Sequence, residues 1–221
     1  MGQTTRGLAI LGSTGSIGTS TLDVVDRLGG RFRVIALAAG SNTALLASQI
    51  RKYRPALVSV RAKKDADRIR GLGKGWRMRV VHGPEGAVEV ARAEGADTVL
   101  SAITGIAGLE PTLEAVRAGR RVALANKESM VVGGGLLRRE AARSGARIIP
   151  VDSEHSGVFQ CLGRERRHVR RVILTASGGP FFRTPLKDMD RKTLEETLRH
   201  PRWVMGRKVT VDSATLMNKG L

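Results

Sequence analysis

The sequence predicts an α/β protein with a doubly wound, mostly parallel sheet, followed by a smaller α+β domain. Two observations carry this prediction. Short β-rich runs alternate with helical patterns through the first 150 residues, and a glycine-rich turn joins the first run to the first helix. After about residue 150 the alternation stops. We therefore expect one domain over residues 1–150 and a second over residues 151–221 that has only begun.

The expected strands are short runs rich in β-branched and aliphatic residues, as in a sheet covered on both faces. Helical periods lie between them, and Pro111 falls within the first turns of one helix, where proline is tolerated. One helix is expected to bury Ile17, Thr21, Val24 or Val25, and Leu28, and another to bury Leu109, Leu113 and Val116. The expected strands are 8–11, 33–37, 56–60, 77–81, 97–103, 121–125 and 147–151.

The second domain has a different rhythm. Residues 171–179 predict a strand that ends in a glycine turn, and residues 180–206 mix a charged helix with a proline-bounded loop. Residues 207–215 predict another strand with a polar end, because Val and Thr alternate there.

Composition excludes some classes of protein. No apolar run approaches the roughly 20 residues that span a bilayer, so no membrane role is expected. The first strand begins almost at the N-terminus, so we expect no signal or transit peptide. The single cysteine, Cys161, excludes an internal disulfide and fits a reducing cytoplasm. We expect Cys161 to be buried in the core.

The chain is strongly basic. Thirty-eight Lys and Arg against 20 Asp and Glu give a net charge of +18, partly concentrated in residues 163–171. Such a field attracts polyanions, so a nucleic-acid-binding protein is one alternative. No aromatic residue interleaves with the basic run to stack on bases, and no nucleic-acid-binding motif is present. The charge predicts a solvated arginine-rich face that also suits small anionic ligands.

The glycine-rich turn, residues 12–18, follows the first strand and opens a helix. Glycines let backbone N–H groups approach a phosphate, and the helix N-terminus adds partial positive charge. The spacing, Gly12-x-x-Gly15-x-x-Gly18, differs from G-x-G-x-x-G, so a plain strand-to-helix turn is the alternative. In this context the turn favours a dinucleotide site.

The end of the second strand indicates which dinucleotide. An NAD site usually has a carboxylate there for the ribose 2′-hydroxyl, but residues 36–43 contain none. Ser41 and Asn42 can instead donate to a 2′-phosphate, which favours NADP.

A pair of carboxylates follows the last strand of the first domain. Asp152 and Glu154 are two residues apart, so on a strand they would share one face. Two carboxylates at one spot favour a cation, and oxygen ligands suit Mg²⁺ or Mn²⁺. The alternative is two solvent-facing acids, and His155 is expected to be structural. Near the C-terminus, Ser213, Thr215, Asn218 and Lys219 are groups that hold a phosphate ester.

Six stretches together resemble the 1-deoxy-D-xylulose 5-phosphate reductoisomerase family: 12–18, 123–129, 150–155, 177–181, 200–206 and 211–220. The resemblance runs from Leu8 to Leu221. It implies a Rossmann-like first domain and an enzyme dependent on NADPH and Mg²⁺ or Mn²⁺. It also implies that the enzyme rearranges and reduces this sugar phosphate to 2-C-methyl-D-erythritol 4-phosphate, in non-mevalonate isoprenoid synthesis.

The resemblance also implies roles for single residues. The catalytic group would be Lys127, Asp152, Glu154 and His200, with Asp152 and Glu154 holding the metal. Lys127, Ser153 and Glu154 would contact the reacting end of the substrate, and Ser177, Ser213, Asn218 and Lys219 its phosphate. His200, Trp203 and Met205 would lie on a flap that covers the substrate. Cofactor contacts would come from Thr14, Gly15, Ser16, Ile17, Gly40, Ser41, Asn42, Asn126, Glu128 and Gly206.

The sequence differs from the family pattern in three ways, of which the one at Ala176 is a small change. Ser41 stands where some members carry lysine, and Ala176 where glycine is common. The family pattern continues past Leu221 to a glutamate that is the third metal ligand. We therefore expect a fragment of a larger, homodimeric enzyme with an exposed second domain. A remnant that holds NADPH and catalyses nothing is the alternative.

Overall fold

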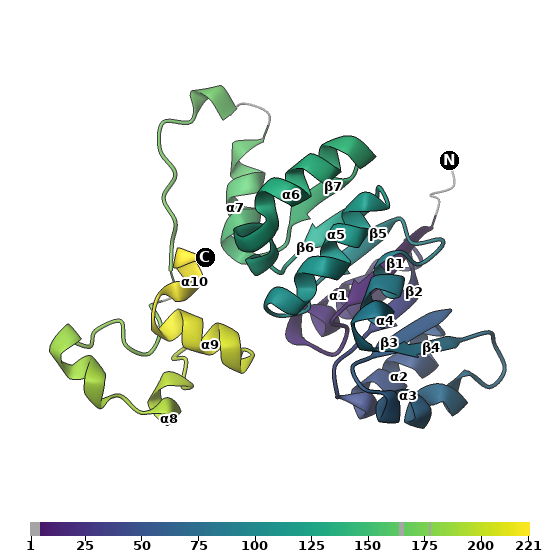
Figure 1. Ribbon diagram of the computed structural model, residues 1–221. Helices are drawn as coiled ribbons and strands as arrows, with labels where there is room; N and C mark the ends of the chain where they lie inside the picture. Colours follow the sequence, from purple (N-terminus) through teal and green to yellow (C-terminus); the bar gives the residue numbers. More distant parts are fainter. Residues whose placement is uncertain (1–4, 164–165, 177) are drawn as a thin grey trace. The chain divides into compact units, whose positions relative to one another are not determined.

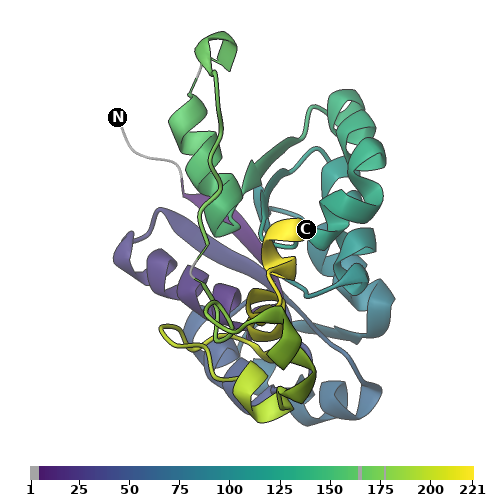
Figure 2. The same cartoon turned by 90° about the vertical axis from the view of Figure 1, so that its left-hand side faces the viewer.

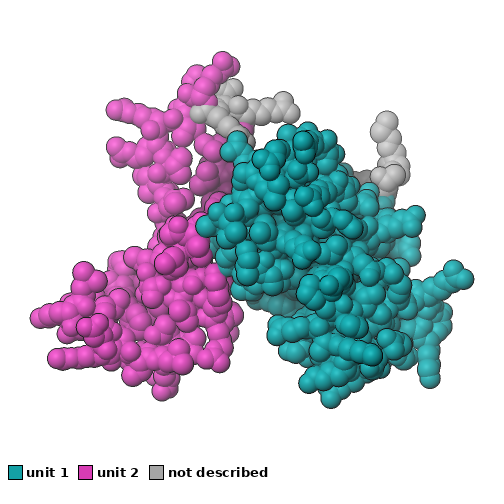
Figure 3. Space-filling model, viewed as in Figure 1, with its two compact units in different colours: residues 1–152 teal, residues 153–221 magenta. Residues whose placement is uncertain are grey.

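The computed structural model describes residues 5–163, 166–176 and 178–221 (Figure 1). The chain divides into two compact units, residues 1–152 and residues 153–221, which Figure 3 colours separately.

The first unit is built on a seven-stranded sheet in which all paired strands are parallel. The strand order is β4-β3-β2-β1-β5-β6-β7, so the chain winds outward from β1 in both directions. This confirms the predicted doubly wound α/β class. The strands are β1 (Arg6–Leu11), β2 (Phe32–Ala38), β3 (Leu57–Val60), β4 (Arg79–His82), β5 (Thr98–Ser101), β6 (Arg121–Leu124) and β7 (Arg147–Pro150).

Helices cover both faces of this sheet (Figure 2). Buried residues of α1, α2 and α3 pack with Leu8 and Ile10 of β1 on one face. Buried residues of α4, α5 and α6 pack with Ala9 and Leu11 on the other. Successive side chains of each strand thus point to opposite faces of the sheet and contribute to two separate hydrophobic cores. The helices are α1 (Ser16–Arg27), α2 (Thr43–Tyr53), α3 (Lys63–Ile69), η1 (Arg70–Gly73), α4 (Gly83–Ala91), η2 (Ile106–Gly108), α5 (Leu109–Arg117) and α6 (Glu128–Ser144).

The buried face of α1 differs from the expected one. Ile17 and Val24 are 40% and 52% exposed, whereas Val25, the expected alternative to Val24, is buried together with Gly18 and Leu22. The helix has two apolar stripes, one with Ile17 and Val24 and one with Leu22 and Val25. Gly18 packs closely against the glycine turn, so the stripe on its side, with Leu22 and Val25, faces the core. In α5 the expected Val116 is buried, and Leu109 and Leu113 pack against the same core.

The second unit consists of short helices joined by extended chain. The expected strand at 171–179 is wrong, because the described residues there belong to no strand. The expected strand at 207–215 is also wrong, because a helix occupies those positions. The elements are α7 (Ser153–Leu162), η3 (Arg166–His168), η4 (Leu186–Arg191), α8 (Leu194–Thr197), α9 (Arg207–Ala214) and α10 (Met217–Gly220).

Both differences have one physical reason. A strand is stable only when a neighbour completes its backbone hydrogen bonds, and no described residue of this unit forms a strand. In residues 207–214 a helix satisfies those groups locally instead, aided by an ion pair between Lys208 and Asp212 at 2.6 Å. β-propensity alone is too weak to decide otherwise.

The second unit leaves many apolar side chains uncovered. Ile173, Leu174, Phe182 and Val204 are all more than half exposed. Cys161 is exposed rather than buried, so the expectation of a core cysteine is wrong. Among the described residues, no helix combines the length and the apolar content that crossing a bilayer requires.

Candidate active site

A crevice opens in the first unit at the carboxyl ends of the central strands. It has a volume of about 700 Å³. Strand order reverses between β1 and β5, and in open α/β sheets ligands bind at this switch point. The residues that line the crevice come from the ends of four strands and from helix starts. Those at or after the strand ends are Gly12, Thr14 and Gly15 (β1), Ala38, Ala39, Gly40, Ser41 and Asn42 (β2), Ser59, Val60 and Arg61 (β3), and Ala102, Ile103 and Thr104 (β5). Those from α4, α5 and the turn before α5 are Gly83, Pro84, Ala87, Ile106, Ala107 and Glu110.

The glycine turn shapes this crevice. Gly12 has φ +90°, and a Cβ there would lie 2.6 Å from the Ala102 carbonyl oxygen. A Cβ at Gly18 would lie 2.3 Å from the Gly12 carbonyl oxygen, so only glycine lets α1 start so close to the turn. Gln49 Nε2 of α2 donates a hydrogen bond to the Ser13 carbonyl oxygen at 2.8 Å and so fixes the backbone of the turn. The cradle is therefore built before any ligand binds.

The helix N-terminus faces the same crevice. Gly15 is the N-cap of α1 and makes no side-chain cap hydrogen bond, and a Cβ there would meet nothing closer than 3.4 Å. Thr14 and Gly15 line the crevice, and Ser16 and Ile17 follow in the first helical turn. The arrangement leaves backbone donors and partial positive charge for a phosphate.

The end of β2 supplies the three expected residues, and β3 supplies one that sequence reasoning missed. Gly40, Ser41 and Asn42 all line the crevice. Asn42 also caps α2, since its Oδ1 accepts from the Leu45 N–H at 3.1 Å. Arg61 lines the crevice as well, and its Nη2 lies 3.5 Å from the position of a Cβ on Gly40. A cation directly after the third strand is the sequence signal that could have identified it.

Asn126 has a structural position. It is buried, its Nδ2 donates to the carbonyls of Ile103 and of Gly105 (2.8 Å), and its Oδ1 accepts from the Ser129 N–H at 2.8 Å. These bonds fix the loop after β5, which lines the crevice. Glu128 begins α6.

Lys127 and Asp152 form an ion pair within the first unit. Lys127 Nζ lies 3.1 Å from Asp152 Oδ2, and the two side chains are only 9% and 17% exposed. Lys127 follows β6, and Asp152 follows β7, the neighbouring strand. The pair is therefore held between adjacent parallel strand ends.

Glu154 has its own lysine within the second unit. Its Oε1 lies 2.7 Å from Lys219 Nζ of α10. The expectation that Asp152 and Glu154 share one face of a strand is wrong, because β7 ends at Pro150 and α7 begins at Ser153. Glu154 occupies the first turn of that helix, so strand alternation does not apply.

The remaining expected residues lie in the second unit, except Ser177, which lies outside the described residues. His200 Nδ1 accepts from the backbone N–H groups of Arg202 (3.2 Å) and Trp203 (3.0 Å). Trp203 is 59% exposed. Ser213 is buried in α9, and its carbonyl oxygen would lie 2.5 Å from a Cβ on Gly179. The others are Ser153 at the start of α7, Met205, Gly206 at the N-cap of α9, and Asn218 in α10.

A divalent metal and a dinucleotide place different demands on the residues of this site. In the described parts of the chain, no group of three or more His, Cys, Asp or Glu is placed to hold a metal ion. Asp152 and Glu154 each have a lysine ammonium within hydrogen-bond distance. The glycine turn fits a dinucleotide phosphate, since Gly15 at the N-cap of α1 lines the crevice and a Cβ there would meet nothing closer than 3.4 Å.

Comparisons with known proteins agree with these features. The family model of 1-deoxy-D-xylulose 5-phosphate reductoisomerase matches residues 8–134, and the model of its C-terminal domain matches residues 148–221. A curated relative of that name from Chlorobium phaeovibrioides is 54% identical over 218 residues, covering 98% of this chain and 57% of the relative. One from Methylococcus capsulatus is 51% identical, with the same coverage. The chain thus spans little more than half the length of these relatives.

Solved structures give the same result. A crystal structure of DOX-P reductoisomerase in complex with NADPH, fosmidomycin and magnesium matches with a TM-score of 0.90 and 38% identity, over 97% of this chain and 56% of that one. The reductoisomerase from Zymomonas mobilis in complex with NADPH matches with a TM-score of 0.88 and 42% identity, over 98% and 56%. By sequence and by structure, this chain belongs to the 1-deoxy-D-xylulose 5-phosphate reductoisomerase family.

Proposed function

We propose that this chain forms the cofactor-binding and metal-binding part of an NADPH- and divalent-metal-dependent enzyme. The enzyme converts 1-deoxy-D-xylulose 5-phosphate to 2-C-methyl-D-erythritol 4-phosphate. The observation that carries the proposal is the glycine-lined crevice at the switch point of the sheet, in a chain of this family. Relatives carry the name of this activity, and one solved neighbour contains both NADPH and magnesium.

Different parts of the crevice are proposed to bind different parts of NADPH. Backbone N–H groups of Thr14, Gly15, Ser16 and Ile17 take the pyrophosphate at the start of α1. Gly40, Ser41 and Asn42 take the adenosine end. We add Arg61 to this group, because its guanidinium supplies the cation that a lysine at position 41 supplies in some members. Asn126 acts by fixing the β5 loop, and Glu128 and Gly206 complete the proposed cofactor contacts.

Asp152 and Glu154 are the proposed metal ligands. Their oxygens suit Mg²⁺ or Mn²⁺, and each already attracts a cation in the form of a lysine ammonium. When bound, the ion supplies Lewis-acid polarisation of the substrate's adjacent carbonyl and hydroxyl oxygens. A bound ion would take the place of the lysine ammonium at each carboxylate, and Lys127 and Lys219 would then be available to the anionic substrate.

The other residues bind and enclose the sugar phosphate. Lys127, Ser153 and Glu154 are proposed to orient its reacting end. The phosphate is proposed to bind Ser177, Ser213, Asn218 and Lys219. The segment that carries His200, Trp203 and Met205 is largely exposed to solvent, and Trp203 in it is 59% exposed. Such exposure suits a flap that closes over the substrate and excludes water during reduction.

The test is NADPH oxidation with 1-deoxy-D-xylulose 5-phosphate and Mn²⁺, followed at 340 nm. We would compare the 221-residue chain, a chain extended to the length of the relatives, and the extended chain with Asp152→Asn. Metal-dependent turnover by the extended chain that Asp152→Asn abolishes supports the proposal. Absence of turnover in the extended chain contradicts it.

A second candidate function is NADPH binding without turnover by this chain. The observation in its favour is that, in the described residues, both proposed metal-binding carboxylates are engaged by lysines and no third acid, His or Cys completes a cluster. It predicts that the 221-residue chain binds NADPH but consumes none at any Mn²⁺ concentration, whereas the extended chain does.

We further propose a homodimeric, cytoplasmic enzyme without a nucleic-acid partner. The family resemblance supports the dimer, and the absence of any aromatic residue within the basic run at 163–171 argues against nucleic acid. Light scattering of the extended chain tests the first point, and titration with duplex DNA at two salt concentrations tests the last.

A further inference from the structure

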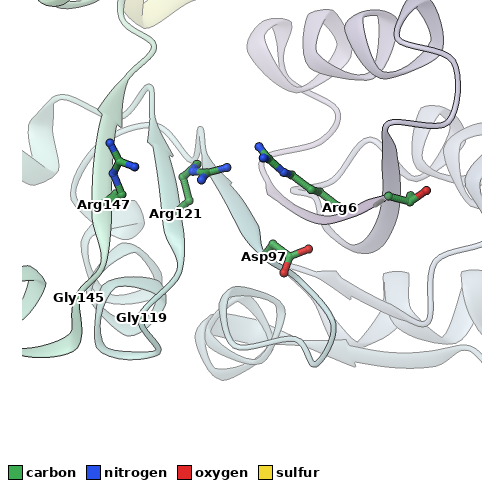
Figure 4. A pocket seen from close by; sticks show the side chains of 7 residues that line it. Arg6, Asp97, Gly119, Arg121, Gly145 and Arg147 are labelled. Atoms are coloured by element: carbon green, nitrogen blue, oxygen red, sulfur yellow. The ribbon is translucent and has the colours of Figure 1, made fainter. Parts of the chain in front are cut away.

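Three arginines begin three strands of the first unit. Arg6 is the first residue of β1, Arg121 of β6 and Arg147 of β7. In the sheet these strands follow the order β1-β5-β6-β7. The three arginines therefore all lie at the amino ends of the parallel strands, whereas the cofactor crevice lies at the carboxyl ends. Figure 4 shows Arg6 and Arg121 extending toward each other from either side of Asp97.

The register places all three side chains on one face of the sheet. Leu8 pairs with Thr98, Thr98 with Arg121, and Arg121 with Arg147. Register partners project to the same side, and Arg6, two residues before Leu8, projects with them. Val122 projects to the other side, into the core shared with α5 and α6. Gly119 and Gly145, which follow the last residues of α5 and α6, also lie beside these arginines, so the helix C-termini place some partial negative charge there.

The arrangement leaves positive charge uncompensated. Arg121 is directly opposite Arg147, and like charges at such positions repel. In the described part of the chain, none of the three guanidinium groups has an ion-pair partner. Asp97 is the one acid among the lining residues, and its Oδ2 accepts from the Gly7 N–H at 2.7 Å. Three arginines against one aspartate leave a charge of +2.

These groups surround a hollow of about 440 Å³, lined by Thr5, Arg6, Asp97, Gly119, Arg121, Gly145 and Arg147, which we call the arginine hollow. Guanidinium groups donate two parallel hydrogen bonds to phosphate oxygens, and binding an anion relieves their mutual repulsion. We propose that the arginine hollow is a binding site for a small anion with two linked phosphate groups. Inorganic pyrophosphate is the simplest such ligand.

The experiment is isothermal titration of the 221-residue chain with pyrophosphate at constant ionic strength. We expect one saturable site. Arg121→Gln and Arg147→Gln should each weaken binding about 10-fold or more, because each removes charged hydrogen bonds. Arg121→Lys should give an intermediate loss, since it keeps the charge and loses the fork.

Arg33→Gln is the matched control. Arg33 is exposed in β2 of the same sheet and pairs with Gly7, so it projects from the opposite face. Removing its charge should change affinity less than about twofold. Circular dichroism checks folding, and Arg147, which is exposed, carries the test if Arg121→Gln does not fold.

Several results would overturn the proposal. An equal loss in Arg33→Gln shows general charge attraction, and full affinity in Arg121→Gln with Arg147→Gln shows binding elsewhere, including the cofactor crevice. Absence of saturable binding removes the site. Tighter binding of duplex DNA, lost in the same two variants, identifies a nucleic-acid surface instead.

Discussion

The ammonium of Lys127 lies 3.1 Å from the carboxylate of Asp152, between the ends of two adjacent parallel strands. Both side chains are largely shielded from water, so the attraction between the two charges is only weakly screened by solvent. The pair links two residues that are proposed to act in catalysis, and its stability can be measured without any substrate.

Replacing Lys127 with Met should destabilise the fold by about 1–3 kcal/mol, because it leaves Asp152 partly buried without its partner. Asp152→Asn in the same background should recover part of the loss. The measurement is a double-mutant cycle from urea unfolding at pH 7, in which the two changes should be non-additive. Lys52→Met is the matched control, since Lys52 pairs with Asp26 at an exposed site and should cost less. Strict additivity would show that the buried pair contributes nothing.

Replacing Gly18 with Ala should destabilise the first unit by about 1–3 kcal/mol or more. The new Cβ would meet backbone atoms of Gly12 and Ser13 within 2.6 Å, and backbone cannot move aside. Gly15→Ala is the contrast, since its Cβ has no contact closer than 3.4 Å and its φ is −80°. Gly15→Ala should keep the unfolding midpoint and weaken NADPH binding. Equal midpoints for the two variants would contradict the geometry.

Arg61→Ala should weaken NADPH binding about 10-fold or more and leave NADH binding unchanged, because only NADPH carries the 2′-phosphate. Fluorescence titration of both cofactors measures this. Arg51→Ala, an exposed change near the far end of α2, is the control and should alter neither. If Arg61→Ala weakened both cofactors equally, Arg61 would contribute general attraction and not selectivity.

Glu114 should make the first unit sensitive to acid. Burial opposes ionisation of Glu114, but hydrogen bonds from Arg117 and Arg92 outweigh it, so its pKa lies below the usual value. The unfolded state therefore binds the proton more readily than the folded state. The contribution of Glu114 to stability is full above its unfolded pKa of about 4.3 and is lost as pH falls through the lower folded pKa.

The corresponding measurement is urea unfolding of the wild-type chain and Glu114→Gln from pH 7 down to about pH 2.5, which spans the unfolded pKa and the region below it. Glu114→Gln should be the less stable protein at pH 7, and the gap should shrink toward pH 4 and below. Glu94→Gln, at an exposed position with no ion-pair partner among the described residues, should show no such trend. A gap that stayed constant with pH would mean that charge is not the source of the stabilisation.

Local patterns in the sequence predicted the strands of the first unit and the glycine turn. Each strand is a short aliphatic run between turns, and such runs fold as parallel strands wherever helices can cover both faces. The turn at residues 12–18 follows from glycine's freedom at φ +90° and from the room that α1 needs. These features depend on neighbours a few residues away, so one sequence was enough to predict them.

Tertiary structure decided the features that depend on distant partners. Residues 207–214 have strand-like composition, but without a neighbouring strand among the described residues they form α9. The expected common face of Asp152 and Glu154 does not exist, because α7 begins between them and each acid pairs with a lysine from elsewhere in the chain. Strand order places Arg61 in the crevice. Strand order and register likewise place Arg6, Arg121 and Arg147 close to one another. Hydrogen-bond pairing and charge proximity are set by the folded sheet, and no periodicity along the chain records them.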